Sequence, residues 1–234
     1  MSIFILQGAK GGAGRTVSSV FLAAGLAAIG RRPLHLQIAM SDRPPIIALA
    51  EGVPFKTTWL PEEHADADAV RRVIEFHPDC STVVIDLPKR YGWEIILQDL
   101  DAIALFPMRY ARWELQAAFQ DYREYIAFKK DVAQRTSSLS PEGCRASLLP
   151  VGWPSVAIHD RYEAVISQFY AALQAGAPRP AISHPGVPQL LHEEIHELMN
   201  GSSFYCRDRV QAAAIDTAKA VLASPPRREA PSAI

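Results

Sequence analysis

The sequence predicts a single α/β domain with a mostly parallel β-sheet covered by helices on both faces. Three observations predict this fold class. The chain has 234 residues, of which 49% are hydrophobic, so it can bury a full core. Short apolar runs alternate with helical segments along its length. Charged residues make up 21% and nearly cancel, to a formal net charge of −1, which argues against disorder and against binding nucleic acid through overall charge.

Six segments have the composition of strands. Ile3–Gln7 is a continuous apolar run that ends at a glycine-rich loop, which is typical of a buried strand. Thr82–Asp86 reads Thr-Val-Val-Ile-Asp, which is β-branched and apolar and therefore suits a central strand. The other predicted strands are Pro33–Ile38, Ala102–Phe106, Ala146–Val151 and Pro180–Ser183.

Helices are predicted between these strands. Thr16–Ile29 is rich in alanine and leucine and is followed by Gly30, a residue that commonly ends helices. Residues 42–62 hold four prolines and little periodicity, so they predict a loop with at most one short helix. Residues 1–223 form the predicted domain, and the proline-rich residues 224–234 a disordered tail. The other predicted helices are Asp66–Phe76, a short one at Ile95–Leu100, Ala111–Gln134, Asp160–Ala175, Val187–Met199 and Arg207–Ala223.

A glycine-rich loop, Ala-Lys-Gly-Gly-Ala-Gly-Arg-Thr at residues 9–16, joins the first strand to the first helix. Its glycines allow a tight turn in which successive backbone N–H groups point inward, and the helix N-terminus attracts anions. Thr16 stands where a hydroxyl would bind Mg²⁺. The loop therefore predicts a phosphate site. Its expected nucleotide-binding residues are Gly11, Gly12, Ala13, Gly14, Arg15, Thr16 and Val17.

Two motifs resemble those of the ParA/MinD family of ATPases. Lys10–Thr16 is similar to the deviant Walker A motif, KGGxGK(S/T), and Val84–Pro88 is similar to the Walker B strand. The resemblance implies a P-loop NTPase-like fold that binds ATP and Mg²⁺. It also implies a nucleotide-bridged homodimer, in which Lys10 reaches the partner's phosphates. By the same resemblance, Asp86 holds Mg²⁺ through water, together with Thr16, so Lys10 and Asp86 are the catalytic candidates.

A narrower resemblance is to the BcsQ branch, which is accessory to bacterial cellulose synthesis. Leu6-Gln7-Gly8, Ile85–Lys89 and Ile182–Pro188 carry it. It implies a cytoplasmic switch or scaffold, recruited to the inner membrane by a protein partner of the cellulose synthase complex. Plasmid or chromosome partition, or another positioning role, is the alternative within the wider family. The tail lacks the pattern of an amphipathic helix, which argues against direct membrane binding.

Three positions depart from the family motifs. Arg15 stands where the Walker A motif has lysine, and arginine is larger with a planar fork. Gln37 and Ala39 replace an acidic pair that orients the attacking water in the family, and Asp42 could substitute only if its loop shifts. Because phosphoryl transfer depends on positioning and charge, we expect ATP binding with weak or absent turnover. A nucleotide-free scaffold remains the alternative.

Two other patterns point to different chemistry. His192-Glu-Glu-Ile-His196 matches HExxH, in which two histidines on one helix face bind zinc, so a zinc hydrolase is an alternative, although short motifs of this kind arise by chance. Basic and aromatic residues alternate on and beside Ala111–Gln134, which would suit nucleic acid, but acidic residues offset the charge and favour a solvated helix. The basic and aromatic residues are Arg109, Tyr110, Arg112, Trp113, Tyr122, Arg123, Tyr125, Lys129 and Lys130.

Overall fold

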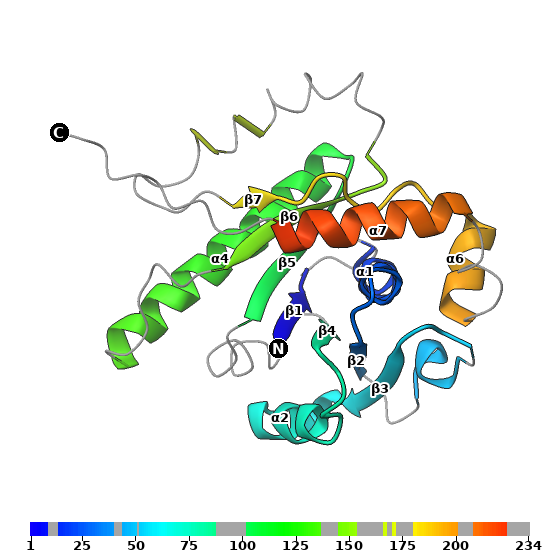
Figure 1. Cartoon of the computed structure of the whole chain (residues 1–234). Coiled ribbons are helices and arrows are strands. Elements are labelled where there is room, and N and C mark those ends of the chain that lie inside the picture. Colours follow the sequence, from blue (N-terminus) through cyan, green and yellow to red (C-terminus); the bar gives the residue numbers. More distant parts are fainter. Residues whose placement is uncertain are drawn as a thin grey trace.

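Seven parallel strands form one sheet in the computed structural model, in the order β3-β2-β4-β1-β5-β6-β7 (Figure 1). The structure describes residues 1–8, 14–39, 44–50, 52–87, 102–136, 145–153, 166–167, 170–171, 180–200 and 208–223. The predicted α/β fold with a parallel sheet is confirmed. The strands are β1 (Ser2–Leu6), β2 (Pro33–Ala39), β3 (Lys56–Pro61), β4 (Thr82–Asp86), β5 (Ala102–Arg109), β6 (Ala146–Val151) and β7 (Ala181–Ile182).

Helices cover both faces of this sheet. On one face lie α1 (Arg15–Ala28), α6 (His192–Asn200) and α7 (Asp208–Ala223), and on the other lie α2 (Ala67–Glu75) and α4 (Arg112–Thr136). Two short 3₁₀ helices, η1 (Ile46–Leu49) and η2 (Glu62–His64), flank β3. The described helices include none that is both long and apolar enough to cross a membrane.

The alternation of side chains along β1 builds the two cores. Ile3 and Ile5 face the core under α2 and α4, whereas Phe4 and Leu6 face the core under α1 and α7. All four side chains are buried because β1 has a strand on each side and helices on each face. A strand buried in this way reads as a continuous apolar run, which is why the sequence identified it.

The structure corrects the prediction that residues 42–62 form a loop with at most one short helix. Lys56–Pro61 is a strand, β3, which pairs in parallel with β2 at the edge of the sheet. Proline is tolerated at the end of an edge strand because no neighbour needs its missing N–H. The nearby prolines hid this strand, although Thr57, Thr58 and Trp59 are residue types that favour strands.

A second correction concerns the helix predicted to start at Val187. Val187 instead forms an isolated parallel bridge with Val151, and helix α6 begins at His192. Glu194 sets that start, because its carboxylate accepts a hydrogen bond from the N–H of Leu191 at 2.8 Å, in the manner of a capping box. Residues 95–100, most of 160–175 and the tail 224–234, for which the sequence also made predictions, lie outside the described residues.

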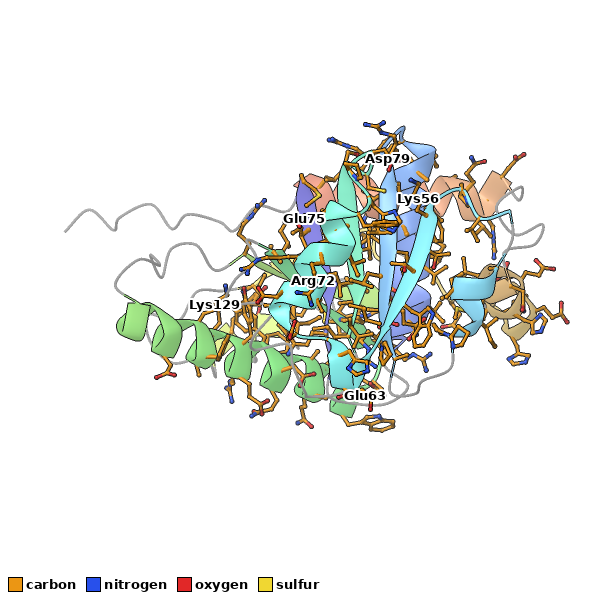
Figure 2. All side chains as sticks on the ribbon, turned by 90° about the horizontal axis from the view of Figure 1, so that it is seen from below. Lys56, Glu63, Arg72, Glu75, Asp79 and Lys129 are labelled. Carbon is orange, nitrogen blue, oxygen red and sulfur yellow. The ribbon has the colours of Figure 1, made fainter. Side chains whose placement is uncertain are left out.

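The side of the molecule that carries α2 and α4 is shown in Figure 2. Lys56 of β3 and Asp79, near the start of β4, form an ion pair of 2.7 Å there. About half of each side chain is exposed, so solvent screens the pair and its contribution to stability is small.

Candidate nucleotide-binding site

The carboxyl ends of β1, β2 and β4 meet at one edge of the sheet. Their register places Leu6 of β1 and Gln37 of β2 beside Asp86 of β4. The chain builds one half of the sheet from β2, β3 and β4 and the other from β5, β6 and β7, with β1 between them. In open parallel sheets, ligands bind beyond the carboxyl ends of the strands at such a switch point. The predicted phosphate loop leaves β1 there.

Helix α1 begins beside this edge. Gly14 is its N-cap, in the left-handed conformation with a φ of 81°. The left-handed backbone favours glycine here, and a Cβ atom at Gly14 would make a tight contact of 3.1 Å with Val151 Cγ1. The first turn of α1 carries no acidic residue to balance the positive end of its dipole. Residues 9–13, which include Lys10, Gly11, Gly12 and Ala13, lie outside the described residues, as does Asp42.

Arg15 contacts the carboxylate that the sequence assigned to Mg²⁺. Its Nε donates to Asp86 Oδ1 at 3.1 Å, and its Nη1 donates to the carbonyl of Gly8 at 2.7 Å. The Asp86 side chain is 3% exposed and the Arg15 side chain 19% exposed. The pair therefore lies largely out of water, where the attraction between opposite charges is stronger than at the surface.

The electrostatics of Asp86 follow from this environment. Burial raises the pKa of Asp86 above its ordinary value, because a charged carboxylate loses its hydration there. The charge of Arg15 and hydrogen bonds from Thr16 and Arg15 oppose that rise in the pKa. Thr16 and Asp86 thus bring a hydroxyl and a carboxylate together, which are ligand types that Mg²⁺ prefers, but Arg15 already binds this carboxylate. Val17 follows in the first turn of α1, where it packs partly buried against the core.

Near this edge, two buried amide oxygens have no hydrogen-bond partner among the described residues. They are Oε1 of Gln7, just beyond the end of β1, and Oε1 of Gln37 on β2. Most buried polar atoms in proteins are hydrogen-bonded, so an orphaned one calls for a ligand or ordered water. Gln37 occupies an acidic position of the family motif, and its amide cannot act as the carboxylate that orients water.

Arg109 is a site residue that sequence reasoning assigned elsewhere, to a basic surface around the long helix. It is the last residue of β5, the strand beside β1. Its Nε and Nη2 lie 3.7 and 3.9 Å from the position that a Cβ of Gly14 would take. This places a second guanidinium beside the positive end of α1, an arrangement that an anion would stabilise. In the sequence, only the position of Arg109 near the end of a predicted strand could have indicated that it lies beside Gly14.

The structure gives little support to the other two patterns. Within HEEIH, His192, Glu193 and His196 are exposed, and the buried Glu194 binds Arg209 Nη2 at 3.0 Å. Among the described residues, no group of three or more histidine, cysteine, aspartate or glutamate side chains could hold a metal ion.

The aromatic residues on and beside α4 divide between core and surface. Tyr122 and Tyr125 are buried at 2% and 0% exposure, so these two rings cannot stack on bases. Tyr110 and Trp113 are exposed, at 50% and 64%. The interpretation of α4 as a helix with one buried and one solvated face therefore accounts for the pattern better than a nucleic-acid surface does.

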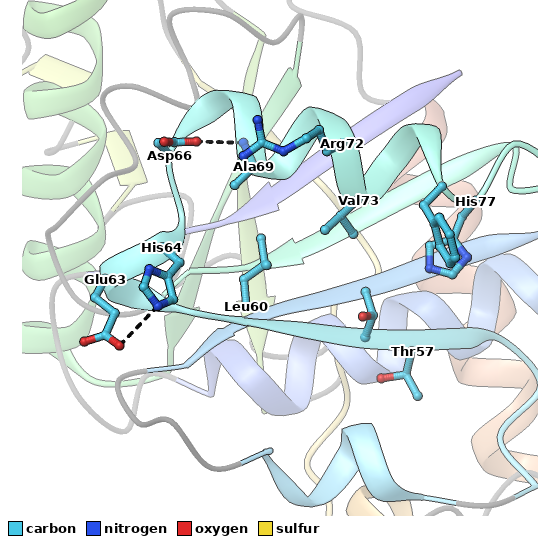
Figure 3. Close-up of a pocket in the computed structure, with 11 residues that line it drawn as sticks. Thr57, Leu60, Glu63, His64, Asp66, Ala69, Arg72, Val73 and His77 are labelled. Carbon is cyan, nitrogen blue, oxygen red and sulfur yellow. Dashed lines mark hydrogen bonds and ion pairs between the residues drawn. The ribbon is translucent and has the colours of Figure 1, made fainter.

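A cleft of about 830 Å³ lies between edge strand β3 and helix α2 (Figure 3). Leu60 and Val73 contribute apolar lining and Arg72 a charged group. Its polar residues include Asp66, whose carboxylate caps α2 by accepting from the N–H of Ala69 at 2.7 Å. No described residue of the predicted phosphate site lines this cleft.

Comparison with known proteins shows the same fold in solved structures. No protein-family model and no curated protein sequence matches the chain. The MinC:MinD cell division complex of Aquifex aeolicus matches at a TM-score of 0.60 and 15% identity, over 95% of this chain and 96% of that one. The ParA family ATPase of Chlorobium tepidum matches at a TM-score of 0.61 and 11% identity, over 93% and 98%.

A third similar structure contains nucleotide. Cobyrinic acid a,c-diamide synthase of Mycobacterium smegmatis, with bound ADP and magnesium, matches at a TM-score of 0.54 and 17% identity, over 85% of this chain and 91% of that one. At these identities the comparisons show that the chain has the α/β fold of the MinD and ParA ATPases. What it binds is decided by its own residues.

Proposed function

We propose that this protein is a ParA/MinD-like switch that binds ATP with its phosphates at the N-terminus of α1. One observation carries the proposal: the positive end of α1, Arg15 and Arg109 converge at the carboxyl end of β1, where Asp86 is the facing carboxylate. Such a concentration of positive charge and free N–H groups suits a polyphosphate. Thr16 and Asp86 stand at the positions that hold Mg²⁺ in the family motif, although Arg15 already binds the carboxylate of Asp86.

Hydrolysis should be weak in this proposal. Gln37 lies next to Asp86 in the sheet, and its amide cannot take up the role of a carboxylate. Arg15, which replaces the Walker A lysine, is bound to Asp86 and Gly8. Nucleotide binding needs neither the water-orienting carboxylate nor the Walker A lysine, because backbone N–H groups and guanidinium donors are enough to hold phosphate.

Calorimetry with ATP, ADP and GTP tests the proposal. We expect ATP to bind, and Arg109→Gln to weaken its affinity by roughly tenfold, because a guanidinium near the phosphates is lost. The matched control is Arg31→Gln, at an exposed position just beyond the far end of α1, which should bind ATP as the wild type does. Absence of binding by any of the three nucleotides would instead favour the nucleotide-free scaffold.

ATP should also join two copies of the chain. The resemblance places Lys10 against the partner's phosphates, so Lys10→Ala is expected to abolish an ATP-dependent dimer while leaving the monomer folded. Analytical ultracentrifugation with and without a non-hydrolysable ATP analogue measures this. A wild-type protein that stays monomeric with the analogue bound would contradict the dimer.

The dimer is proposed to organise a larger bacterial machine through a protein partner. The similar MinC:MinD structure is a complex with such a partner, which supports this kind of role. Our preferred machine is the cellulose synthase complex, with the protein in the cytoplasm and recruited to the inner membrane by its partner. Its support is the BcsQ-like sequence around Gln7, Asp86 and Pro185. A partition or positioning role is the second candidate, favoured by the similarity to a ParA family ATPase.

A further inference from the structure

We propose that Arg15 takes the place of Mg²⁺ as the cation between Asp86 and the nucleotide's phosphates, so that this chain binds nucleotide equally well with and without Mg²⁺. The inference rests on the proposed function, because it concerns how the same site holds phosphate. It starts from the contact between Arg15 and Asp86, which the Walker A lysine of the family motif does not predict.

The carboxylate of Asp86 already has a positive partner. Arg15 Nε lies 3.1 Å from Asp86 Oδ1, and the carboxylate is almost completely buried. A metal ion at this position would need the same negative charge. It would either share the carboxylate with the guanidinium, at the cost of repulsion between two cations, or displace Arg15 and leave it without its partner. Either route reduces the free energy that Mg²⁺ gains from Asp86.

The guanidinium can also reach phosphate while it holds Asp86. An arginine side chain has five N–H donors in a planar fork, and here one is used by Asp86 and one by the carbonyl of Gly8. The remaining donors have no partner among the described residues, and a planar fork matches phosphate oxygens in pairs. Carboxylate, guanidinium and phosphate then alternate in charge, as carboxylate, metal ion and phosphate do.

Gly8 holds this guanidinium in place. Gly8 is buried at the end of β1, and its carbonyl accepts from Arg15 Nη1 at 2.7 Å. The side chain is thus fixed at two points, on β4 and beyond β1, before any ligand binds. A lysine could not make both contacts and still present a planar pair of donors, because its ammonium is a single point charge.

Calorimetric titration of the full chain with ADP and a non-hydrolysable ATP analogue, in excess Mg²⁺ and in excess EDTA, tests the inference. For the wild type, the two dissociation constants should agree within about threefold. For Arg15→Lys, which keeps the charge but not the fork, affinity should fall by about tenfold or more in EDTA. The matched control, Arg31→Lys at an exposed position just beyond the far end of α1, should behave as the wild type does.

A second measurement follows from linkage. If Mg²⁺ does not change nucleotide affinity, the protein cannot change the affinity of the metal for the nucleotide. Electron paramagnetic resonance with Mn²⁺ should therefore show similar Mn²⁺ affinity for free and wild-type-bound nucleotide. This readout needs only the wild type, so it decides the question even if Arg15→Lys does not fold.

The outcomes separate the inference from the proposed function. Nucleotide binding by the wild type that weakens about tenfold in EDTA overturns the inference and leaves the proposed function standing. Tighter Mn²⁺ binding in the wild-type complex than on free nucleotide does the same. Absence of nucleotide binding in both buffers overturns the proposed function and the inference together.

Discussion

Replacing Gly25 by alanine is expected to lower the free energy of unfolding by about 3 kcal/mol. Gly25 is buried in the middle of α1, where α7 crosses it. A Cβ atom there would overlap the backbone carbonyl of Ala214 and lie 3.1 Å from the Cβ of Ala218, both on α7. A backbone carbonyl cannot rotate away as a flexible side chain can, so α7 as a whole must shift.

Urea denaturation measures this loss of stability. Intrinsic helix propensity would by itself make Gly25→Ala more stable. Alanine is favoured over glycine by about 1 kcal/mol inside a helix, so a net loss of stability reports the overlap alone. The matched variant is Ala212→Gly, at an exposed position of α7, which should lose only that propensity difference. A Gly25→Ala protein as stable as the wild type would mean that α1 and α7 are not packed so closely.

Acidification from pH 7 to pH 5 is expected to lower the free energy of unfolding of the wild type by about 2 kcal/mol through His35 alone. Burial lowers the pKa of His35 from 6.5 to about 4, because the charged imidazole would lose its hydration. Below pH 6.5 the unfolded chain takes up a proton at this residue and the folded chain does not. The stability that His35 contributes is therefore present above pH 6.5 and is lost as the pH falls toward 4.

The contacts of His35 explain why it stays neutral. Its Nε2 lies 2.9 Å from the hydroxyl of Ser19, which also donates to the carbonyl of Thr16 at 2.8 Å. Among the described residues, its Nδ1 has no hydrogen-bond partner, and Phe55 packs near the ring with 6.0 Å between the ring centroids. None of these contacts is a carboxylate, which would stabilise a charged imidazole. The ring instead supports the first turn of α1, beneath the proposed phosphate site.

Urea denaturation of His35→Gln at both pH values separates this residue from other titrating groups. Between pH 7 and pH 5, the free energy of unfolding of the variant should fall by about 2 kcal/mol less than that of the wild type. His192→Gln, at an exposed position of α6, is the matched control and should keep the wild-type pH dependence. An unchanged pH dependence in His35→Gln would contradict the burial of a neutral imidazole.

Local patterns were sufficient for most of the fold. The apolar run at the start of the chain, the β-branched strand that ends at Asp86 and the alanine-rich helix after the loop all lie within a residue or so of their predicted positions. Strand β3 was missed because it lies at an edge, where burial is incomplete and proline is tolerated. The start of α6 was misplaced because Val187 pairs with distant Val151.

The sequence by itself determined that a glycine-rich loop joins a buried strand to a helix, and that Arg15 replaces the lysine of the Walker A motif. Such features are local, because spacing and residue type decide them. Only the tertiary structure decided that Arg15 binds Asp86, 71 residues further along the chain, and that Arg109 lies beside Gly14. Those contacts depend on β1 lying between β4 and β5 and on the register of the three strands, which no local pattern specifies.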